Sequence, residues 1–126
     1  MDIMFTSQKF AKIVNDQKLL VREHGDRQAR LLRRRLDELR DADNLEDLRS
    51  LPQTRCHELI GNRAGQLSVD LVHPYRLIFM PANEPPPMKP DGGLDWRCVT
   101  TVLIIGVEDT HGEPCLESIC PRLCVT

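Results

Sequence analysis

Apolar residues in the first third of the chain recur at the spacing of a helix. A short alternating stretch at residues 2–5 predicts a strand. The apolar stripe that follows predicts one helix, which begins after Thr6 or Ser7 and runs to about Glu23. We expect a second helix over residues 27–42, and its buried face has apolar residues at helical spacing: Ala29, Leu32, Leu36 and Leu39.

The period changes from helical to strand-like at about Arg55. Alternating or continuously apolar stretches predict four strands, over residues 55–61, 66–72, 76–80 and 98–107. The segment 81–96 is rich in proline and glycine, and we expect an exposed loop that can be shortened without loss of folding. This order predicts an α+β domain of two layers, in which N-terminal helices pack on a mainly antiparallel sheet of about four strands.

The composition limits the class of protein. The chain has 126 residues and a mass of 14.4 kDa, enough for one domain with a modest core. It has no apolar run of membrane-spanning length and no apolar signal core near its start, so we expect a cytoplasmic protein without a membrane partner. The five cysteines would be reduced in that compartment, and their odd number argues against a closed disulfide framework.

Charge is unevenly distributed, although the formal net charge is only −2. Six arginines lie outside the apolar stripe of the second helix, and we expect them on its outward face: Arg27, Arg30, Arg33, Arg34, Arg35 and Arg40. Such a run is either an ordinary solvated face or a surface for phosphates or an acidic partner. The pattern alone leaves both interpretations open.

The last expected strand ends on an unusual set of polar groups. Its apolar run stops at "EDTHG", which places two carboxylates, a hydroxyl and an imidazole before a glycine. A plain strand end needs only a turn former. Groups that can move protons at this point therefore indicate a candidate site.

Three motifs accompany this strand end in a set order. His57 lies in a strand before a Gly-Asn-Arg-Ala-Gly turn at 61–65, an aromatic-Arg-hydrophobic-x-Phe strand follows at 75–79, and the late strand ends in Asp-Thr-His at 109–111. In the order and spacing of these motifs the chain resembles the RelE/ParE toxin superfamily. Within that superfamily it is most similar to the plasmid-maintenance killer branch, the HigB-like toxins.

The resemblance implies the toxin component of a type II toxin–antitoxin system. HigB-like toxins are ribosome-dependent endoribonucleases, or mRNA interferases, that cleave mRNA in the decoding site, and a cognate helix-turn-helix antitoxin neutralises them. The implied partners are therefore the ribosome, mRNA and an antitoxin, with a homodimer or a heterotetramer with the antitoxin as possible assemblies. ParE-type members of the same fold poison DNA gyrase instead, so the fold alone does not decide the function.

The similarity covers residues 1 to about 112. We therefore expect a RelE/ParE-like toxin domain over 1–112 and a poorly ordered C-terminal tail over 113–126.

Cleavage of RNA by transesterification sets the chemistry that the candidate residues must perform. A base removes the proton of the ribose 2′-OH, an acid protonates the departing 5′-oxygen, and cationic donors stabilise the phosphate. We assign proton transfer to His57 and His111, with Asp109 orienting His111 or accepting a proton itself. Arg63 and Arg76 are assigned to the phosphate, because the planar guanidinium can bind two oxygens.

These assignments have ordinary structural alternatives. His57 can be a plain strand histidine, and Arg76 can pair with Asp70 across the expected hairpin. Thr110 stands where the family usually has tyrosine, so it can contact the substrate through its hydroxyl but cannot stack on a base. Together with the low net charge, this leaves open a catalytically weak module that binds an antitoxin without cutting RNA.

The tail carries ligand types that zinc accepts. His111 and three cysteines form the spacing H-x3-C-x4-C-x3-C, with the thiols at Cys115, Cys120 and Cys124. This spacing matches no pair of CxxC knuckles, so we interpret the thiols as incidental and expect no metal or other cofactor.

Overall fold

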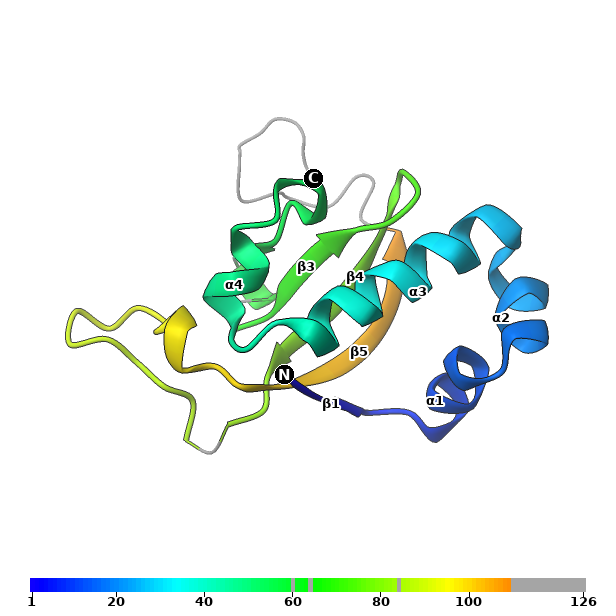
Figure 1. Cartoon of the computed structure of the whole chain (residues 1–126). Coiled ribbons are helices and arrows are strands. Elements are labelled where there is room, and N and C mark those ends of the chain that lie inside the picture. The colour runs from blue at the N-terminus through cyan, green and yellow to red at the C-terminus, as the bar shows by residue number, and fades with distance from the viewer. Residues whose placement is uncertain (60, 64, 84, 110–126) are drawn as a thin grey trace.

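Two helices, over residues 26–41 and 45–49, cover one face of a five-stranded sheet, and the two helices before them, over residues 8–24, lie to one side of it (Figure 1). The computed structural model describes residues 1–59, 61–63, 65–83 and 85–109. Within these ranges a first strand precedes four α-helices, and four further strands follow them. The expected α+β class is confirmed, with five strands in place of about four.

The sheet brings the first and last strands together. Its order is β1 (Asp2–Phe5), β5 (Thr101–Asp109), β4 (Tyr75–Pro81), β3 (Leu67–Asp70) and β2 (His57–Glu58). β1 runs parallel to β5, whereas the other three pairs are antiparallel. A parallel pair needs a long connection, and here the helices and the other three strands all lie between β1 and β5 in the chain.

The N-terminal helical segment is two helices rather than one: α1 (Gln8–Asn15) and α2 (Gln17–His24). Asp16 between them has extended backbone, and its Oδ1 accepts hydrogen bonds from the backbone N–H groups of Lys18 at 3.0 Å and Leu19 at 3.3 Å. An aspartate that caps a new helix in this way interrupts the preceding one. The expectation of one continuous helix to Glu23 is therefore wrong at Asp16.

Two later helices follow the apolar pattern closely. α3 (Asp26–Asp41) buries the expected stripe of alanine and leucines. α4 (Leu45–Arg49) is capped by Asn44, whose Oδ1 accepts a hydrogen bond from the backbone N–H of Asp47 at 3.0 Å. A 3-10 turn, η1 (Pro52–Thr54), leads from α4 towards β2.

The expected outward face of arginines on α3 is wrong at Arg35. Arg27, Arg30, Arg34 and Arg40 are exposed, and Arg33 is half-buried, with its Nη2 donating to the backbone oxygen of Val14. Arg35 is only 6% exposed. Its buried guanidinium links the helical layer to the candidate site described below.

A bulge in β5 sets which of its side chains face the core. Ile78 pairs with Gly106 whereas Phe79 pairs with Ile104, so Ile105 is an extra residue on β5. Because of this insertion, Ile104 and Val107 both contact the core although they are three residues apart. Gly106 has φ +152°, which a glycine accommodates at such a point.

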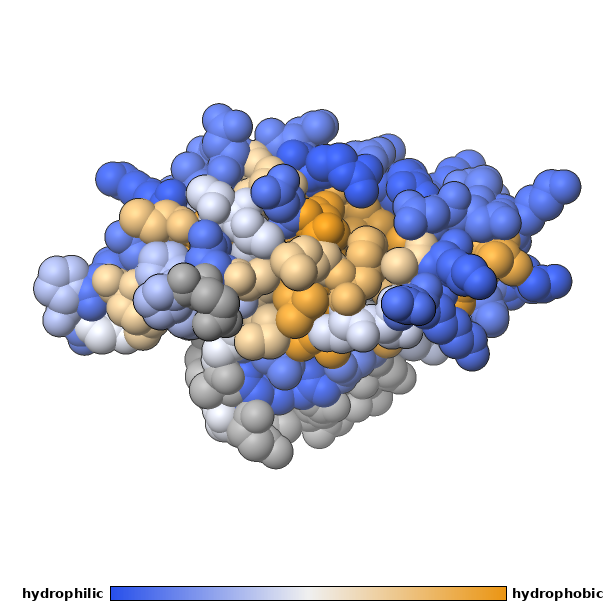
Figure 2. Space-filling view, turned by 90° about the horizontal axis from the view of Figure 1, so that it is seen from below, coloured by the Kyte–Doolittle hydropathy of each residue, from blue (hydrophilic) through white to orange (hydrophobic). Residues whose placement is uncertain are grey.

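The main core lies between the helices and the inner face of the sheet. Its buried strand residues include Leu67, Val69, Leu77, Phe79 and Val102. Apolar side chains also gather in the middle of the surface seen in Figure 2, on the side where β1 lies in Figure 1. No helix in the described ranges is long and apolar enough to cross a membrane.

The proline-rich segment returns to the core at Trp96, where the expectation of an exposed loop as far as residue 96 is wrong. Trp96 begins the 3-10 turn η3 (Trp96–Cys98) and is 7% exposed. Its indole Nε1 donates to Oε1 of Glu58 at 2.9 Å, and the guanidinium carbon of Arg49 lies 4.2 Å from the ring centroid. The aromatic side chain therefore anchors the end of the loop against β2 and α4.

The projecting part of this loop should remain dispensable. Replacing residues 85–93 by a short Gly-Ser linker should leave the thermal midpoint within a few degrees, because loop length has a weak effect on stability and this change spares Trp96. Thermal unfolding followed by circular dichroism measures the difference. The matched deletion of 85–96, which removes Trp96, should destabilise the fold, and equal midpoints for the two deletions would contradict the anchoring role of the tryptophan.

Candidate active site

The face of the sheet opposite the helices carries the polar candidates. The strand registers pair His57 with Ser68, Asp70 with Arg76, and Arg76 with Glu108. Directly paired residues point to the same side of a sheet, and so do residues two apart in one strand, such as Ser68 and Asp70. All five side chains therefore share the open face.

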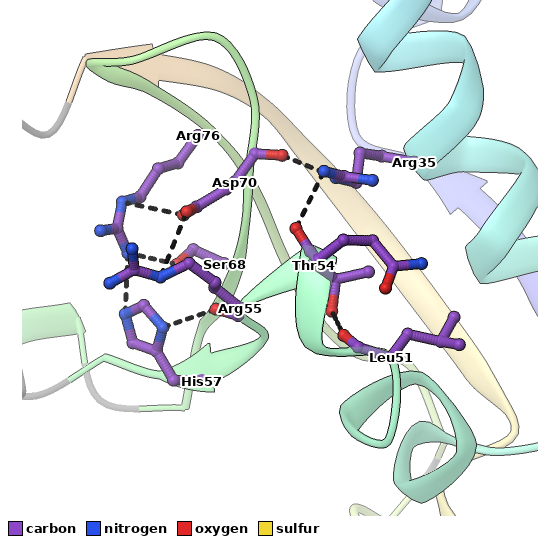
Figure 3. A network of polar contacts seen from close by, with 9 residues as sticks. Arg35, Leu51, Thr54, Arg55, His57, Ser68, Asp70 and Arg76 are labelled. Carbon is purple, nitrogen blue, oxygen red and sulfur yellow. Dashed lines mark hydrogen bonds and ion pairs between the residues drawn. The ribbon is translucent and has the colours of Figure 1, made fainter.

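His57 and Arg76 contact each other directly on this face (Figure 3). Nη1 of Arg76 lies 2.9 Å from Nε2 of His57, and Nδ1 of His57 lies 2.8 Å from the backbone oxygen of Arg55. A guanidinium can only donate and a carbonyl oxygen can only accept, so Nε2 is the acceptor and Nδ1 is the donor. Both contacts require the same neutral tautomer, with the proton on Nδ1 and the basic nitrogen turned towards Arg76.

Asp70 holds Arg76 from the other side. Its Oδ1 lies 3.7 Å from Nε of Arg76, and its Oδ2 lies 3.4 Å from Nε of Arg55. The hydroxyl of Ser68 accepts a third contact, from Nη1 of Arg76 at 3.3 Å. The expected alternative pairing of Arg76 with Asp70 is therefore confirmed, and it coexists with the contact to His57.

A buried arginine supports this cluster from the core side (Figure 3). Nε of Arg35 donates to the backbone oxygen of Asp70 at 2.7 Å, and Nη2 donates to the backbone oxygen of Gln53 at 2.9 Å. Nη1 forms an ion pair with Oε1 of Glu38 at 2.8 Å. Arg35 thus fixes the end of β3 and the turn that precedes His57.

The sequence did contain a signal that Arg35 is buried, but the interpretation of the six arginines as one charged outward face passed over it. Arg35 lies three residues after Leu32 and four before Leu39, which places it on the apolar stripe of α3. An arginine at a buried position of this kind indicates partners inside the protein.

Arg63 reaches the same face from a 3-10 turn, η2 (Gly61–Arg63), and forms an ion pair with Glu108. Its Nη1 also donates to Oε1 of Gln66 at 3.2 Å. The structure therefore connects Arg63 to Glu108, which lies opposite Arg76 in the pairing of β4 and β5. It also adds Glu108, a residue that had not been assigned to the site.

Of the other assigned residues, the structure describes only the backbone of Asp109. Asp109 is the last residue of β5, where its backbone pairs with Tyr75, but its side chain lies outside the described residues. Thr110, His111 and the tail over 113–126 also lie outside them, together with the zinc alternative at Cys115, Cys120 and Cys124. Among the described residues, no group of three or more His, Cys, Asp or Glu side chains could hold a metal ion.

Cys56, the neighbour of His57, does not supply a ready nucleophile. Burial raises the pKa of its thiol to about 12, with a smaller opposing effect from Arg49. Because the thiolate is the reactive form, this thiol stays protonated and inert at neutral pH. The chemistry of the described cluster therefore depends on the imidazole and the arginines rather than on a Cys–His pair.

The described side chains leave the site slightly cationic, since three arginines face two carboxylates: Arg55, Arg63 and Arg76 against Asp70 and Glu108. Arg55, which the sequence analysis had not assigned, has the most accessible side chain of the three at 65% exposed, against 27% for Arg63 and 15% for Arg76. It is thus well placed to meet an anion first.

The chain matches no model of a known protein family and no curated protein. The function of the chain is therefore inferred from the geometry of these residues.

Proposed function

We propose that the chain is a HigB-like toxin that cleaves mRNA on the ribosome through the open face of its sheet, and that a cognate antitoxin neutralises it in the cytoplasm. The observation that carries the proposal is the 2.9 Å contact between His57 and Arg76. It places a basic imidazole nitrogen beside a cation suited to phosphate, which are the two parts that transesterification needs together.

In the proposed reaction, Nε2 of His57 takes the proton of the ribose 2′-OH. The 2′-oxygen then attacks phosphorus, and the bond from phosphorus to the 5′-oxygen breaks to leave a 2′,3′-cyclic phosphate. Arg76 and Arg55 stabilise the charge that develops on the phosphate oxygens. His111 is the proposed acid that protonates the 5′-oxygen, an assignment that rests on the resemblance.

The charge distribution supports a polyanionic partner. Residues 8–34 contain eight lysines and arginines but only three aspartates and glutamates, in a chain whose net charge is −2. They form α1, α2 and the first half of α3, and α1 and α2 lie to one side of the sheet (Figure 1). A local excess of cations of this kind favours a phosphate backbone over an uncharged partner.

Cleavage should depend on translation. The protein should cut message on programmed ribosomes and leave the same RNA largely intact when it is free, because the ribosome would orient the substrate on the open face of the sheet. Primer extension on translated message should show breaks inside codons. Equal cleavage of free RNA would contradict the ribosome-dependent mechanism.

One observation favours a second candidate, a binding module without nuclease activity. The two arginines that the sequence assigned to the phosphate already contact carboxylates, Arg63 through Glu108 and Arg76 through Asp70. Wild-type protein that neither cuts message nor arrests growth, yet binds the product of an adjacent helix-turn-helix gene, would favour the module. Inhibition of DNA supercoiling without RNA cleavage would instead favour a gyrase poison.

A further inference from the structure

We infer that a phosphate group opens this site by drawing Arg76 away from His57. In the closed arrangement, which is the one in the structure, Arg76 donates to Nε2 of His57. Asp70 is the positioning residue that holds Arg76 in this arrangement in competition with the phosphate. The inference deepens the proposed function and rests on it for the role of His57 as the base. The groups that it involves, on His57, Arg76 and Asp70, all belong to described residues.

Neither nitrogen of His57 can accept a proton in the closed arrangement. Nδ1 already carries its proton and donates it to the backbone oxygen of Arg55 at 2.8 Å. The lone pair of Nε2 receives the N–H of Arg76 at 2.9 Å. A base must use a free lone pair, so Arg76 has to leave Nε2 before His57 can act on a ribose hydroxyl.

A phosphate is the ligand best suited to move Arg76. Two of the contacts that hold its guanidinium are neutral, to the imidazole of His57 and the hydroxyl of Ser68. A phosphate offers two anionic oxygens to the planar fork, and such charge-assisted pairs are about twice as strong as neutral ones. Exchange of the neutral partners for a phosphate would therefore be favourable, and it would release Nε2 at the moment when substrate is present.

Asp70 is the anionic partner of Arg76 that opposes this exchange. Its Oδ1 lies 3.7 Å from Nε of Arg76, is buried, and has no hydrogen-bond partner within the described part of the chain. A buried carboxylate oxygen in this state attracts a nearby cation strongly. Its position is maintained by Arg35, whose Nε holds the backbone oxygen of Asp70 at 2.7 Å. Asp70 is thus held in place while Arg76 exchanges partners.

The direct test follows the imidazole nitrogens of His57 by ¹⁵N NMR while inorganic phosphate replaces chloride at constant ionic strength. The free wild-type protein should show a protonated Nδ1 and a hydrogen-bonded, unprotonated Nε2. Added phosphate should shift the Nε2 resonance saturably while the Nδ1 proton stays in place. In Arg76→Gln the Nε2 resonance should already be shifted and should not respond, whereas Arg97→Gln, a change at an exposed arginine in η3, should behave as wild type.

Asp70→Asn tests the positioning role separately. Loss of the competing charge should lower the phosphate midpoint, the phosphate concentration at which the Nε2 shift is half complete, by about 2–5-fold. This is the range expected for one partly exposed ion pair. In cleavage assays the same variant should lower KM while it also lowers kcat, because Arg76 is no longer aimed. Asp91→Asn, on the exposed loop, is the matched control and should change neither quantity.

Three results would overturn the inference: a proton on Nε2 in the free protein, an Nε2 resonance that phosphate does not move, or a phosphate midpoint that Asp70→Asn leaves unchanged or raises. These readouts do not depend on nuclease activity. A protein that cuts no RNA but shows the phosphate response would contradict the proposed function alone, whereas an active nuclease without the response would contradict this inference alone.

Discussion

His57→Gln should lower the rate of message cleavage by about 10²–10⁴-fold, the usual contribution of one acid–base residue. Glutamine keeps a polar side chain of similar reach on the open face, but it cannot accept and release a proton near neutral pH. His57 is outside the core, so the fold should remain intact. Single-turnover cleavage of ribosome-bound message measures the effect, and growth arrest without antitoxin gives a second readout.

His73→Gln is the matched control for this change. His73 is an exposed histidine in the turn before β4, and its replacement should leave cleavage near the wild-type rate. If His57→Gln and His73→Gln both retained full activity in folded proteins, His57 would be an ordinary strand histidine. The binding-module interpretation would then replace the nuclease.

Arg35→Met should lower the free energy of unfolding by about 3–5 kcal/mol, the usual effect of removing one partner from a buried ion pair. Methionine has a similar reach but donates no hydrogen bond, so Glu38 loses its ion-pair partner, and the backbone oxygens of Asp70 and Gln53 lose their donors. For a domain of this size we expect the thermal midpoint to fall by about 10–20 °C. Urea unfolding followed by circular dichroism measures the change in free energy.

Arg34→Met provides the control at the neighbouring position of α3. Arg34 is exposed, so this change should alter stability by no more than about 0.5 kcal/mol. Both variants remove one positive charge from the same helix, and therefore a general charge effect would shift both equally. Equal midpoints for the two variants would show that the contacts of Arg35 do not support the fold.

Local patterns predicted the elements whose causes lie close in sequence. The apolar stripe of α3 was predicted correctly, because helical periodicity acts within a few residues. The single N-terminal helix was wrong because Asp16 has good helical neighbours on both sides, and only its hydrogen bonds to Lys18 and Leu19 reveal that it begins a second helix.

The contacts among the candidate residues come from the tertiary structure. His57 and Arg76 contact each other, and Arg63 forms an ion pair with Glu108, which lies opposite Arg76 in the sheet. The roles assigned to these residues stay predictions. The sequence could not show that Arg63 meets Glu108, because that ion pair joins residues far apart in the chain. Asp109, Thr110 and His111 remain predictions.

The sequence by itself determined the α+β class, the apolar faces of the helices and strands, and the supply of imidazole and guanidinium groups, because these follow from composition and short-range periodicity. Only the tertiary structure decided that β1 lies beside β5, that Arg35 binds the backbone oxygens of Asp70 and Gln53, and that the bulge at Ile105 turns Glu108 to the open face. Without that extra residue, simple alternation from Ile104 would point Glu108 into the core. Such outcomes depend on strand pairing and packing between distant segments, for which one local stretch of sequence carries no signal.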